Sequence, residues 1–332
     1  MDIKKITELE DKILNDYSNI AGIVVSKDGK VNYEKYFNNC TPQSRIHVYS
    51  VTKSILSLLI GIAMDKGYIK DVNQKILDFF PEYNVTKNEA VIQNITLKNL
   101  LTMTAPYKYR DNVPYTEYFT SSDWVKFSLD QLGGREQIGT FRYTPLIGPD
   151  ILSGILVKAT GASVFDFASE HLFSPLDITV ERPIVFHSKE EQFAFNESTT
   201  ISGWVADQAG VNAGGWGLTL SPVDMAKIGQ LYLNDGIWEE KQIVSAKWMD
   251  ESMSEHSFWD EQGLSYGYLW WIVDTQEKAC AAMGDGGNVI YFNKKKNLVI
   301  SIASLFAPNV SDRIELIKNF IEPLFWGCCK MT

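Results

Sequence analysis

The sequence predicts an α+β fold in which one antiparallel sheet, built from both ends of the chain, is flanked by helices. Two observations support this prediction: strand-like segments occur near the two ends of the chain, and the long stretch between them carries helical patterns. We therefore expect an α/β sheet subdomain formed by residues 1–75 and 255–332, with a mainly helical subdomain inserted at 76–254. A chain of 332 residues is long enough for both parts to form one module around a sizeable core.

The N-terminal part predicts a helix, a hairpin and a second helix in that order. Apolar and charged residues alternate at helical spacing in the first residues and indicate an amphipathic helix. Residues 20–25 are apolar and β-branched, residues 31–37 alternate in polarity, and Asp28-Gly29 between them predicts a hairpin turn. Residues 50–66 carry apolar side chains along one face and predict a helix that ends at Gly67.

The rest of the chain predicts helices first and strands afterwards. Helical patterns occur at 97–102, 150–159, 164–172 and 222–233. The pair Ser221-Pro222 is typical of a helix start, because Ser caps the first turn and Pro fits its first position. Strand-like segments follow at 266–273, 288–292 and 298–304, and residues 311–320 predict a final amphipathic helix.

The charge of the chain argues against a nucleic-acid partner. There are 31 Lys and Arg against 41 Asp and Glu, which gives a formal net charge of −10. Proteins that bind nucleic acids neutralise phosphates with clustered basic residues. The one basic run, Lys294-Lys295-Lys296, lies between Asn residues and is typical of a solvated turn.

The histidines and cysteines argue against a metal site. His47, His171, His187 and His256 are far apart, and Cys40, Cys280, Cys328 and Cys329 form no C-x-x-C motif. A zinc site needs clustered nitrogen and sulfur ligands, so we expect no metal. Four cysteines, two of them adjacent, do not form a disulfide framework, and a reducing compartment fits best.

The start of the chain is charged and lacks the unbroken apolar segment of a secretory leader. The longest apolar stretch, residues 54–64, is too short to cross a bilayer. We therefore expect a cytoplasmic protein that does not associate with membranes.

Ser50-Val51-Thr52-Lys53 is the chain's S-x-x-K tetrad and opens the helix predicted at 50–66. The spacing of three residues puts the hydroxyl and the amine on one helix face. The free N–H groups and positive dipole end of the first turn favour a developing alkoxide or oxyanion there. A desolvated amine nearby can take the serine proton. Taken alone, the tetrad is better explained by a helix-capping Ser and a surface Lys, and the surrounding sequence reverses that preference.

Further short motifs surround this tetrad and continue along the chain. They are His47 to Ile55, Gly61-Ile62-Ala63, Gly67-Tyr68-Ile69, Ile76 to Glu82, Ile95 to Thr104, Ala213-Gly214-Gly215, Leu218 to Lys227 and Gly284 to Gly287. Together these segments resemble the serine β-lactamase/penicillin-binding-protein superfamily over roughly residues 20–304. The most similar branch is the class C-like group, which includes esterases and 6-aminohexanoate-oligomer hydrolases. The resemblance implies a β-lactamase/transpeptidase-like fold with a catalytic cleft between the two subdomains.

The resemblance also implies catalytic roles for three residues. Ser50 is expected to be the nucleophile and Lys53 its base. Tyr143, in Phe141-Arg142-Tyr143-Thr144-Pro145, occupies the Tyr of the family's Y-x-N motif and is expected to relay a proton to the leaving group. Pro145 stands where the family has Asn, so a side-chain amide that would contact Lys53 and substrate is missing.

The third element implied by the resemblance is the K-T-G or H-x-G segment, which we assign to Asp285, Gly286 and Gly287. The glycines let the backbone approach a ligand closely. By analogy, the backbone N–H groups of Ser50 and Asn288 are expected to form the oxyanion hole. Asp285 stands where relatives have a cation that meets a substrate carboxylate, so it would repel such a substrate. The alternative is that Asp285 points away and pairs with a surface Lys.

Two aromatic residues, Tyr107 and Trp216, are candidates for lining the substrate pocket, with core packing as the alternative for each. A competing motif, Gly263-Leu264-Ser265-Tyr266-Gly267, matches the nucleophile elbow G-x-S-x-G. That elbow needs a strand before it, a helix after it and a His downstream, and the sequence predicts none of these.

The sequence thus predicts a serine hydrolase, either a carboxylesterase or an amidase, that forms an acyl-enzyme on Ser50 without a cofactor. We expect a small-molecule ester, amide or short peptide substrate that is neutral or carries an amine, and poor turnover of β-lactams. The alternative is a penicillin-binding or acyl-capturing protein, or an inactive scaffold of the same fold. The oligomeric state stays open.

Overall fold

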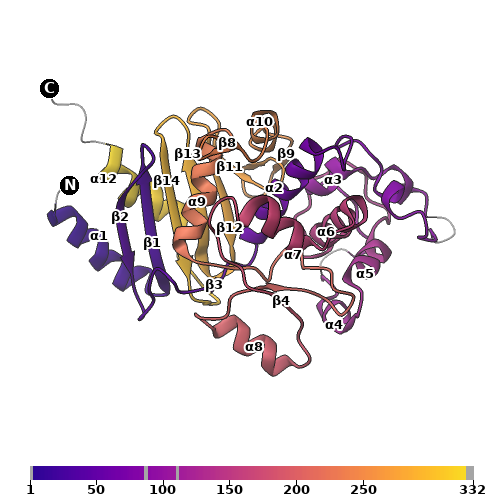
Figure 1. The fold of residues 1–332 in the computed structure, drawn as a ribbon, viewed down its shortest axis with the longest axis horizontal. Helices are drawn as coiled ribbons and strands as arrows, with labels where there is room; N and C mark the ends of the chain where they lie inside the picture. The colour runs from indigo at the N-terminus through magenta and orange to yellow at the C-terminus, as the bar shows by residue number, and fades with distance from the viewer. Residues whose placement is uncertain (1–2, 86–88, 110–111, 327–332) are drawn as a thin grey trace.

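A computed structural model describes residues 3–85, 89–109 and 112–326. Its centre is an eight-stranded antiparallel sheet with the strand order β2-β1-β14-β13-β12-β11-β10-β9. The strands are β1 (Ile20–Lys27), β2 (Lys30–Tyr36), β9 (Ser257–Trp259), β10 (Leu264–Tyr266), β11 (Trp271–Asp274), β12 (Ala279–Gly284), β13 (Asn288–Asn293) and β14 (Leu298–Ser304). The predicted α+β fold with a sheet from both ends of the chain is confirmed (Figure 1).

The two ends of the chain meet where β1 pairs with β14. In this antiparallel pair Ile23 lies opposite Ile302, and both side chains are fully buried. The hairpin from β1 to β2 turns at Asp28 and Gly29, whose φ angles are 52° and 74°. Both values lie in the left-handed region that a two-residue hairpin of this type requires, which explains the Asp-Gly pair.

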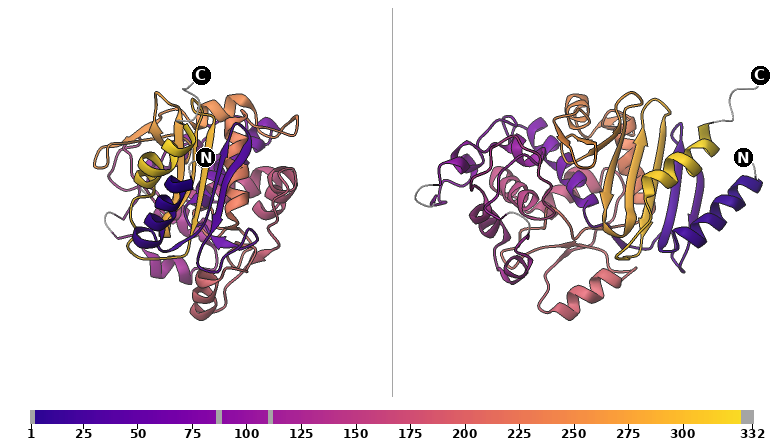
Figure 2. Two further views of the ribbon diagram at one scale, coloured as in Figure 1. Left: turned by 90° about the vertical axis from the view of Figure 1, so that its left-hand side faces the viewer. Right: turned by 180° about the vertical axis from the view of Figure 1, so that it is seen from behind.

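Helices cover both faces of the sheet. On one face lie α1 (Ile3–Asp16) and the C-terminal helices α11 (Arg313–Leu316), η5 (Ile317–Ile321) and α12 (Glu322–Trp326), whose apolar residues share a core with β1, β13 and β14 (Figure 2). On the other face lie α2 (Val51–Asp65) and α9 (Pro222–Leu233). Helix α9 lies so close to the sheet that a Cβ at Gly229 would be 2.5 Å from the Val299 side chain.

Helix α2 runs through the middle of the protein. Every residue from Val51 to Ala63 is buried, which suits a helix that is apolar on nearly all sides. Gly61 is required by close packing, since a Cβ there would lie 2.3 Å from the Trp248 indole. The helix is therefore a rigid support for whatever its first turn presents.

The inserted region is mainly helical and lies beside the sheet (Figure 1). Of its helices, α9 packs on the sheet as described above. The others are η1 (Ile76–Phe79), η2 (Val91–Asn94), α3 (Leu97–Leu101), α4 (Tyr115–Thr120), α5 (Trp124–Gln131), α6 (Ile147–Thr160), α7 (Val164–Ala168), η3 (Ser169–Phe173), α8 (Lys189–Glu197) and α10 (Ala246–Ser252). Three short strand pairs join β3 (Ile46–His47) to β6 (Thr219–Leu220), β4 (Pro183–Ile184) to β5 (Trp204–Val205) and β7 (Ile237–Trp238) to β8 (Lys241–Gln242).

The prediction of one strand at 266–273 was wrong, because two strands, β10 and β11, occupy that stretch and a turn separates them. Leu269 in this turn has φ of 60°. Its N–H donates to the Leu101 carbonyl at 2.9 Å and its carbonyl accepts from the Ser54 hydroxyl at 2.7 Å. Contacts with the helical region therefore override a run of residues that favours extended structure.

The C-terminal helix predicted at 311–320 is divided into α11, η5 and α12 and reaches Trp326. Cys40 and Cys280 are free thiols, whereas Cys328 and Cys329 lie outside the described residues. In the described ranges no single helix is long and apolar enough to cross a membrane. One bent pair, α6 with α7 and η3, has the length and apolar composition of a membrane-spanning segment.

Candidate active site

Ser50 is the N-cap residue of α2 and lies half-buried at the end of the sheet. Its hydroxyl makes no capping hydrogen bond and instead accepts one from the Lys53 ammonium at 2.8 Å. The preceding residue, Tyr49, has φ of 49°, so the chain turns sharply before it enters the helix. Within the described part of the chain, the Ser50 N–H donates to no other group. Ser50 therefore offers a free amide and a hydroxyl held by an amine.

Lys53 lies one turn further along α2, and only 1% of its surface is exposed. Its ammonium makes a second hydrogen bond to the Gly215 carbonyl at 3.0 Å. The described residues place no carboxylate within ion-pair distance of this ammonium. An amine held at this distance from a hydroxyl can take its proton when the amine is neutral.

Tyr143 joins these two residues from the helical region. The centroid of its ring lies 5.2 Å from Lys53 Nζ, and the ring stacks on Trp271 at 5.6 Å with an interplanar angle of 30°. Pro145, two residues later, supplies no side-chain donor, and its carbonyl oxygen would lie 2.1 Å from a Cβ at Gly215. The segment that contains Tyr143 therefore packs directly on Gly215, whose carbonyl accepts a hydrogen bond from Lys53.

The loop Asp285–Gly287 is a tight turn between β12 and β13 rather than part of a strand. Gly286 and Gly287 have φ of 77° and 87°, which only glycine adopts readily. The Asn19 amide donates to the Gly286 carbonyl at 2.7 Å, and the buried Asn288 amide donates to the Asp285 carbonyl at 2.8 Å. These bonds fix the turn that follows Gly284, beside the start of α2.

Gly284, just before this turn, is the residue that approaches Ser50. A Cβ at Gly284 would lie 2.2 Å from the Val48 carbonyl oxygen and 3.1 Å from the Ser50 nitrogen. Asn288 pairs with Gly284 across the hairpin, and its side-chain oxygen accepts from the Ser304 N–H at 2.9 Å. The end of β12 therefore lies against the first turn of α2.

Asp285 is exposed, and the described residues give it no ion pair. The surface Lys that sequence analysis allowed as a partner is therefore not seen there. Burial raises the pKa of both Tyr49 and Tyr115, and the nearby Asp285 charge raises each of them further. Tyr143 adds a smaller effect of the same sign at Tyr115. The Tyr49 and Tyr115 side chains therefore lie near a carboxylate that has no ion-pair partner among the described residues.

The structure does not bring Tyr107 to Ser50. Tyr107 is 2% exposed and packs on Gly148, where a Cβ would lie 2.7 Å from its hydroxyl. Trp216 follows Gly215 but points into the core, where its indole N–H donates to the Tyr118 hydroxyl at 3.1 Å. Ser265 lies in strand β10 and donates to Glu255, so it has neither the turn nor the base of a nucleophile elbow.

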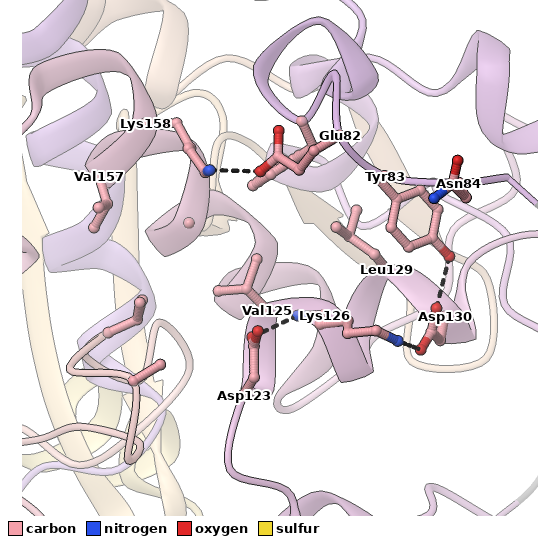
Figure 3. A pocket seen from close by; sticks show the side chains of 14 residues that line it. Glu82, Tyr83, Asn84, Asp123, Val125, Lys126, Leu129, Asp130, Val157 and Lys158 are labelled. Carbon is pink, nitrogen blue, oxygen red and sulfur yellow. Dashed lines mark hydrogen bonds and ion pairs between the residues drawn. The ribbon is translucent and has the colours of Figure 1, made fainter.

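A separate pocket of about 480 Å³ lies between α5, α6 and the segment after η1 (Figure 3). Four of its charged groups form two ion pairs: Lys158 with Glu82 at 2.5 Å, and Asp130 with Lys126 at 2.6 Å. None of the three predicted catalytic residues lines it. The pocket is therefore separate from the cluster of Ser50, Lys53 and Tyr143.

Two residues of the site were missed by sequence reasoning. Gly284 belongs to the motif Gly284 to Gly287 that carries the family resemblance, but the sequence assigns no role to Gly284 itself. Asp150 is buried in α6 and accepts the Gly214 N–H at 2.8 Å. Gly214 directly precedes Gly215, whose carbonyl holds Lys53. A single carboxylate in the apolar segment 147–157 is a signal that could have drawn attention to it.

Comparisons with known proteins identify the family of the chain and its fold. A family model described as Beta-lactamase matches residues 11–319. A 6-aminohexanoate-dimer hydrolase from Paenarthrobacter ureafaciens is 23% identical over 305 residues, which cover 83% of this chain and 70% of that protein. A family VIII carboxylesterase structure gives a TM-score of 0.71 at 17% identity and covers 95% of both chains. The octameric penicillin-binding protein homologue from Pyrococcus abyssi gives 0.69 at 21% identity, covering 96% of this chain and 76% of that one. The predicted β-lactamase/transpeptidase-like fold is confirmed.

Proposed function

Because the chain belongs to the Beta-lactamase family, we propose that it is a serine hydrolase that cleaves an ester or amide through an acyl-enzyme on Ser50. Lys53 takes the Ser50 proton as the hydroxyl oxygen attacks the substrate carbonyl. Tyr143 passes a proton to the leaving group, and water then hydrolyses the acyl-enzyme. This scheme uses side chains and backbone amides alone.

The observation that carries the proposal is the 2.8 Å contact between Lys53 Nζ and Ser50 Oγ. Lys53 is almost completely enclosed, so solvent does not compete for this bond. The absence of an ion-pair partner for Lys53 in the described ranges also favours a role in proton transfer over a structural salt bridge.

The Ser50 amide is the first proposed donor to the oxyanion. For the second donor, the close approach of Gly284 to Ser50 favours the amide of the next residue, Asp285. The Asn288 amide, which the sequence resemblance suggested, lies across the hairpin from Gly284 and is the alternative. Two converging amides would stabilise the tetrahedral intermediate far more than water does, because they are already oriented.

The exposed carboxylate of Asp285 supports a neutral or amine-bearing substrate. A substrate carboxylate brought next to it would be repelled, whereas an ammonium group would be attracted. The surrounding Tyr49 and Tyr115 rings would also favour a cation over an anion. For the same reason, we propose that β-lactams, which carry a carboxylate, are turned over poorly.

The proposal is tested by measuring hydrolysis of p-nitrophenyl esters and of nitrocefin by the purified protein and by Ser50→Ala. We expect ester turnover that depends on Ser50 and little nitrocefin hydrolysis. Efficient nitrocefin turnover would overturn the substrate assignment. Equal ester turnover by both proteins would overturn the assignment of Ser50.

The stoichiometry of the reaction distinguishes a hydrolase from the alternative, a penicillin-binding or acyl-capturing protein. Such a protein would accumulate one acyl group per chain by intact mass and release product only in a single burst. An inactive scaffold would give neither adduct nor product.

A further inference from the structure

A buried carboxylate lies behind the catalytic lysine, and no step of the proposed mechanism uses it. Asp150 is in the first turn of α6 and is 1% exposed. One of its oxygens accepts the Gly214 N–H at 2.8 Å. Its other oxygen, Oδ2, has no well-formed hydrogen bond within the described residues, although Tyr118 lies near enough to lower the pKa of Asp150. A buried carboxylate without an ion-pair partner costs stability.

The segment that Asp150 holds is the one that holds Lys53. Gly214 donates to Asp150, and Gly215, the next residue, accepts from the Lys53 ammonium at 3.0 Å. Both glycines are pressed against the start of α6 and the residues before it. A Cβ at Gly214 would lie 2.1 Å from the Pro149 carbonyl oxygen, and one at Gly215 would lie 2.1 Å from that of Pro145.

Trp216, the residue after Gly215, is also held near Asp150. The Trp216 indole donates to the Tyr118 hydroxyl at 3.1 Å, and Tyr118 lies close enough to Asp150 for each group to shift the pKa of the other. Burial raises the pKa of Asp150 to about 7, and the Asp207 charge adds to that rise. The Gly214 N–H, Tyr118 and the Lys53 charge act against it. Asp150 and Tyr118 therefore anchor the chain on both sides of the Gly215 carbonyl.

We propose that Asp150 is a positioning residue for the Lys53 base. Through the Gly214 amide it fixes the Gly215 carbonyl, and this carbonyl aims the Lys53 ammonium at the Ser50 hydroxyl. Lys53 has only these two hydrogen-bond partners among the described residues, so a displaced Gly215 carbonyl leaves the amine without its second restraint. Displacement of a reacting group by about 1 Å costs about a hundredfold in rate. This inference rests on the proposed function of Ser50 and Lys53.

The test is the second-order rate constant for labelling Ser50 with a fluorophosphonate, measured from pH 6 to 9 on the purified chain. Asp150→Asn keeps an oxygen that can accept the Gly214 N–H, so it should label within about threefold of wild type. Asp150→Leu is nearly isosteric but accepts nothing, so its rate constant should fall by about tenfold or more, with a changed pH profile. If Asp150→Leu does not fold, Asp150→Ser replaces it, because its hydroxyl is too short to reach the amide.

Asp207→Leu is the matched control. Asp207 is also buried and accepts two backbone N–H groups, from Trp124 and Val211, each at 2.9 Å. Its charge raises the pKa of Asp150, but it forms no hydrogen bond with Lys53, Gly214 or Gly215 among the described residues. We expect this variant to lose stability and to keep its labelling rate. Equal loss of labelling in Asp150→Leu and Asp207→Leu, or failure of Asp150→Asn to restore it, would overturn the positioning role. A wild-type chain that does not label at Ser50 would overturn the proposed function instead.

Discussion

Lys53 and Ser50 lie one turn apart on α2, with the lysine nitrogen 2.8 Å from the serine oxygen and the lysine almost wholly enclosed by protein. The helix that carries them is buried from Val51 to Ala63 and cannot shift without disturbing the core. The helix therefore holds the amine and the hydroxyl at a fixed distance.

Lys53→Met removes the amine and keeps a chain of similar length. We expect ester turnover to fall by about 10²–10⁴-fold, which is the range for loss of a general base. The control is Lys66→Met at the exposed C-terminal end of the same helix, which should leave turnover unchanged. Steady-state kinetics with a p-nitrophenyl ester checks this, and a Lys53→Met variant as active as Lys66→Met would contradict the role of Lys53.

Tyr143→Phe removes the hydroxyl and keeps the ring that stacks on Trp271. Because the stacking survives, the unfolding midpoint should change little. The value of kcat should fall by about 10²-fold, with a larger loss for amides, whose leaving group needs a proton more than p-nitrophenolate does. Tyr83→Phe, in the separate pocket, is the control. Unchanged amide hydrolysis by Tyr143→Phe would remove Tyr143 from the mechanism.

Gly284→Ala introduces a Cβ that would lie 2.2 Å from the Val48 carbonyl oxygen, and a backbone atom cannot move aside cheaply. We expect a loss of about 1–3 kcal/mol in the free energy of unfolding together with a large loss of activity. Gly67→Ala, at the other end of α2, is the contrast, since it meets no atom within 4 Å but has φ of 79°. It should lose about 1 kcal/mol and keep its activity. Denaturation and ester kinetics on both variants distinguish the two effects.

Asp285→Lys reverses the charge at the mouth of the site. We expect nitrocefin acylation to rise and turnover of amine-bearing esters to fall, both by severalfold and both less at high salt, because the carboxylate is exposed and screened. Asp250→Lys on α10 makes the same change of net charge elsewhere on the surface. If the two variants respond alike, the effect is one of net charge and the assignment of Asp285 to substrate selection fails.

The buried carboxyl group of Asp150 should also make the free energy of unfolding depend on pH. Its raised pKa of about 7 means that between about pH 4 and pH 7 the folded state binds more protons than the unfolded state, so this group costs stability as the pH rises. Asp150→Asn removes that cost. From pH 5 to pH 8 the stability of Asp150→Asn relative to wild type should therefore increase by about 2–3 kcal/mol. Urea denaturation at the two pH values measures this, and a constant difference would show that Asp150 titrates normally.

Local signals made much of the fold predictable from the sequence. The Asp28-Gly29 turn, the Ser221-Pro222 helix start and the apolar segment of α2 each determine structure through residues that are adjacent in the chain. The break between β10 and β11 was not predictable in this way, because Leu269 is held by Leu101 and Ser54, which are distant in sequence.

The candidate site divides along the same line. Ser50 and Lys53 are three residues apart on one helix, so their proximity follows from helix geometry. The Gly215 carbonyl and Asp150 carry no sequence motif of their own, and only folding brings them behind Lys53. The position of Gly284 was not predictable from the sequence, because its close approach to Ser50 depends on how β12 packs against α2.

Every role proposed for the site depends on Ser50 as the nucleophile, and peptide mapping after treatment with a fluorophosphonate identifies the nucleophile. We expect one adduct per chain, located on the peptide that contains Ser50, and none in Ser50→Ala. An adduct on another serine, or equal labelling of wild type and Ser50→Ala, would contradict the role of Ser50 as the nucleophile.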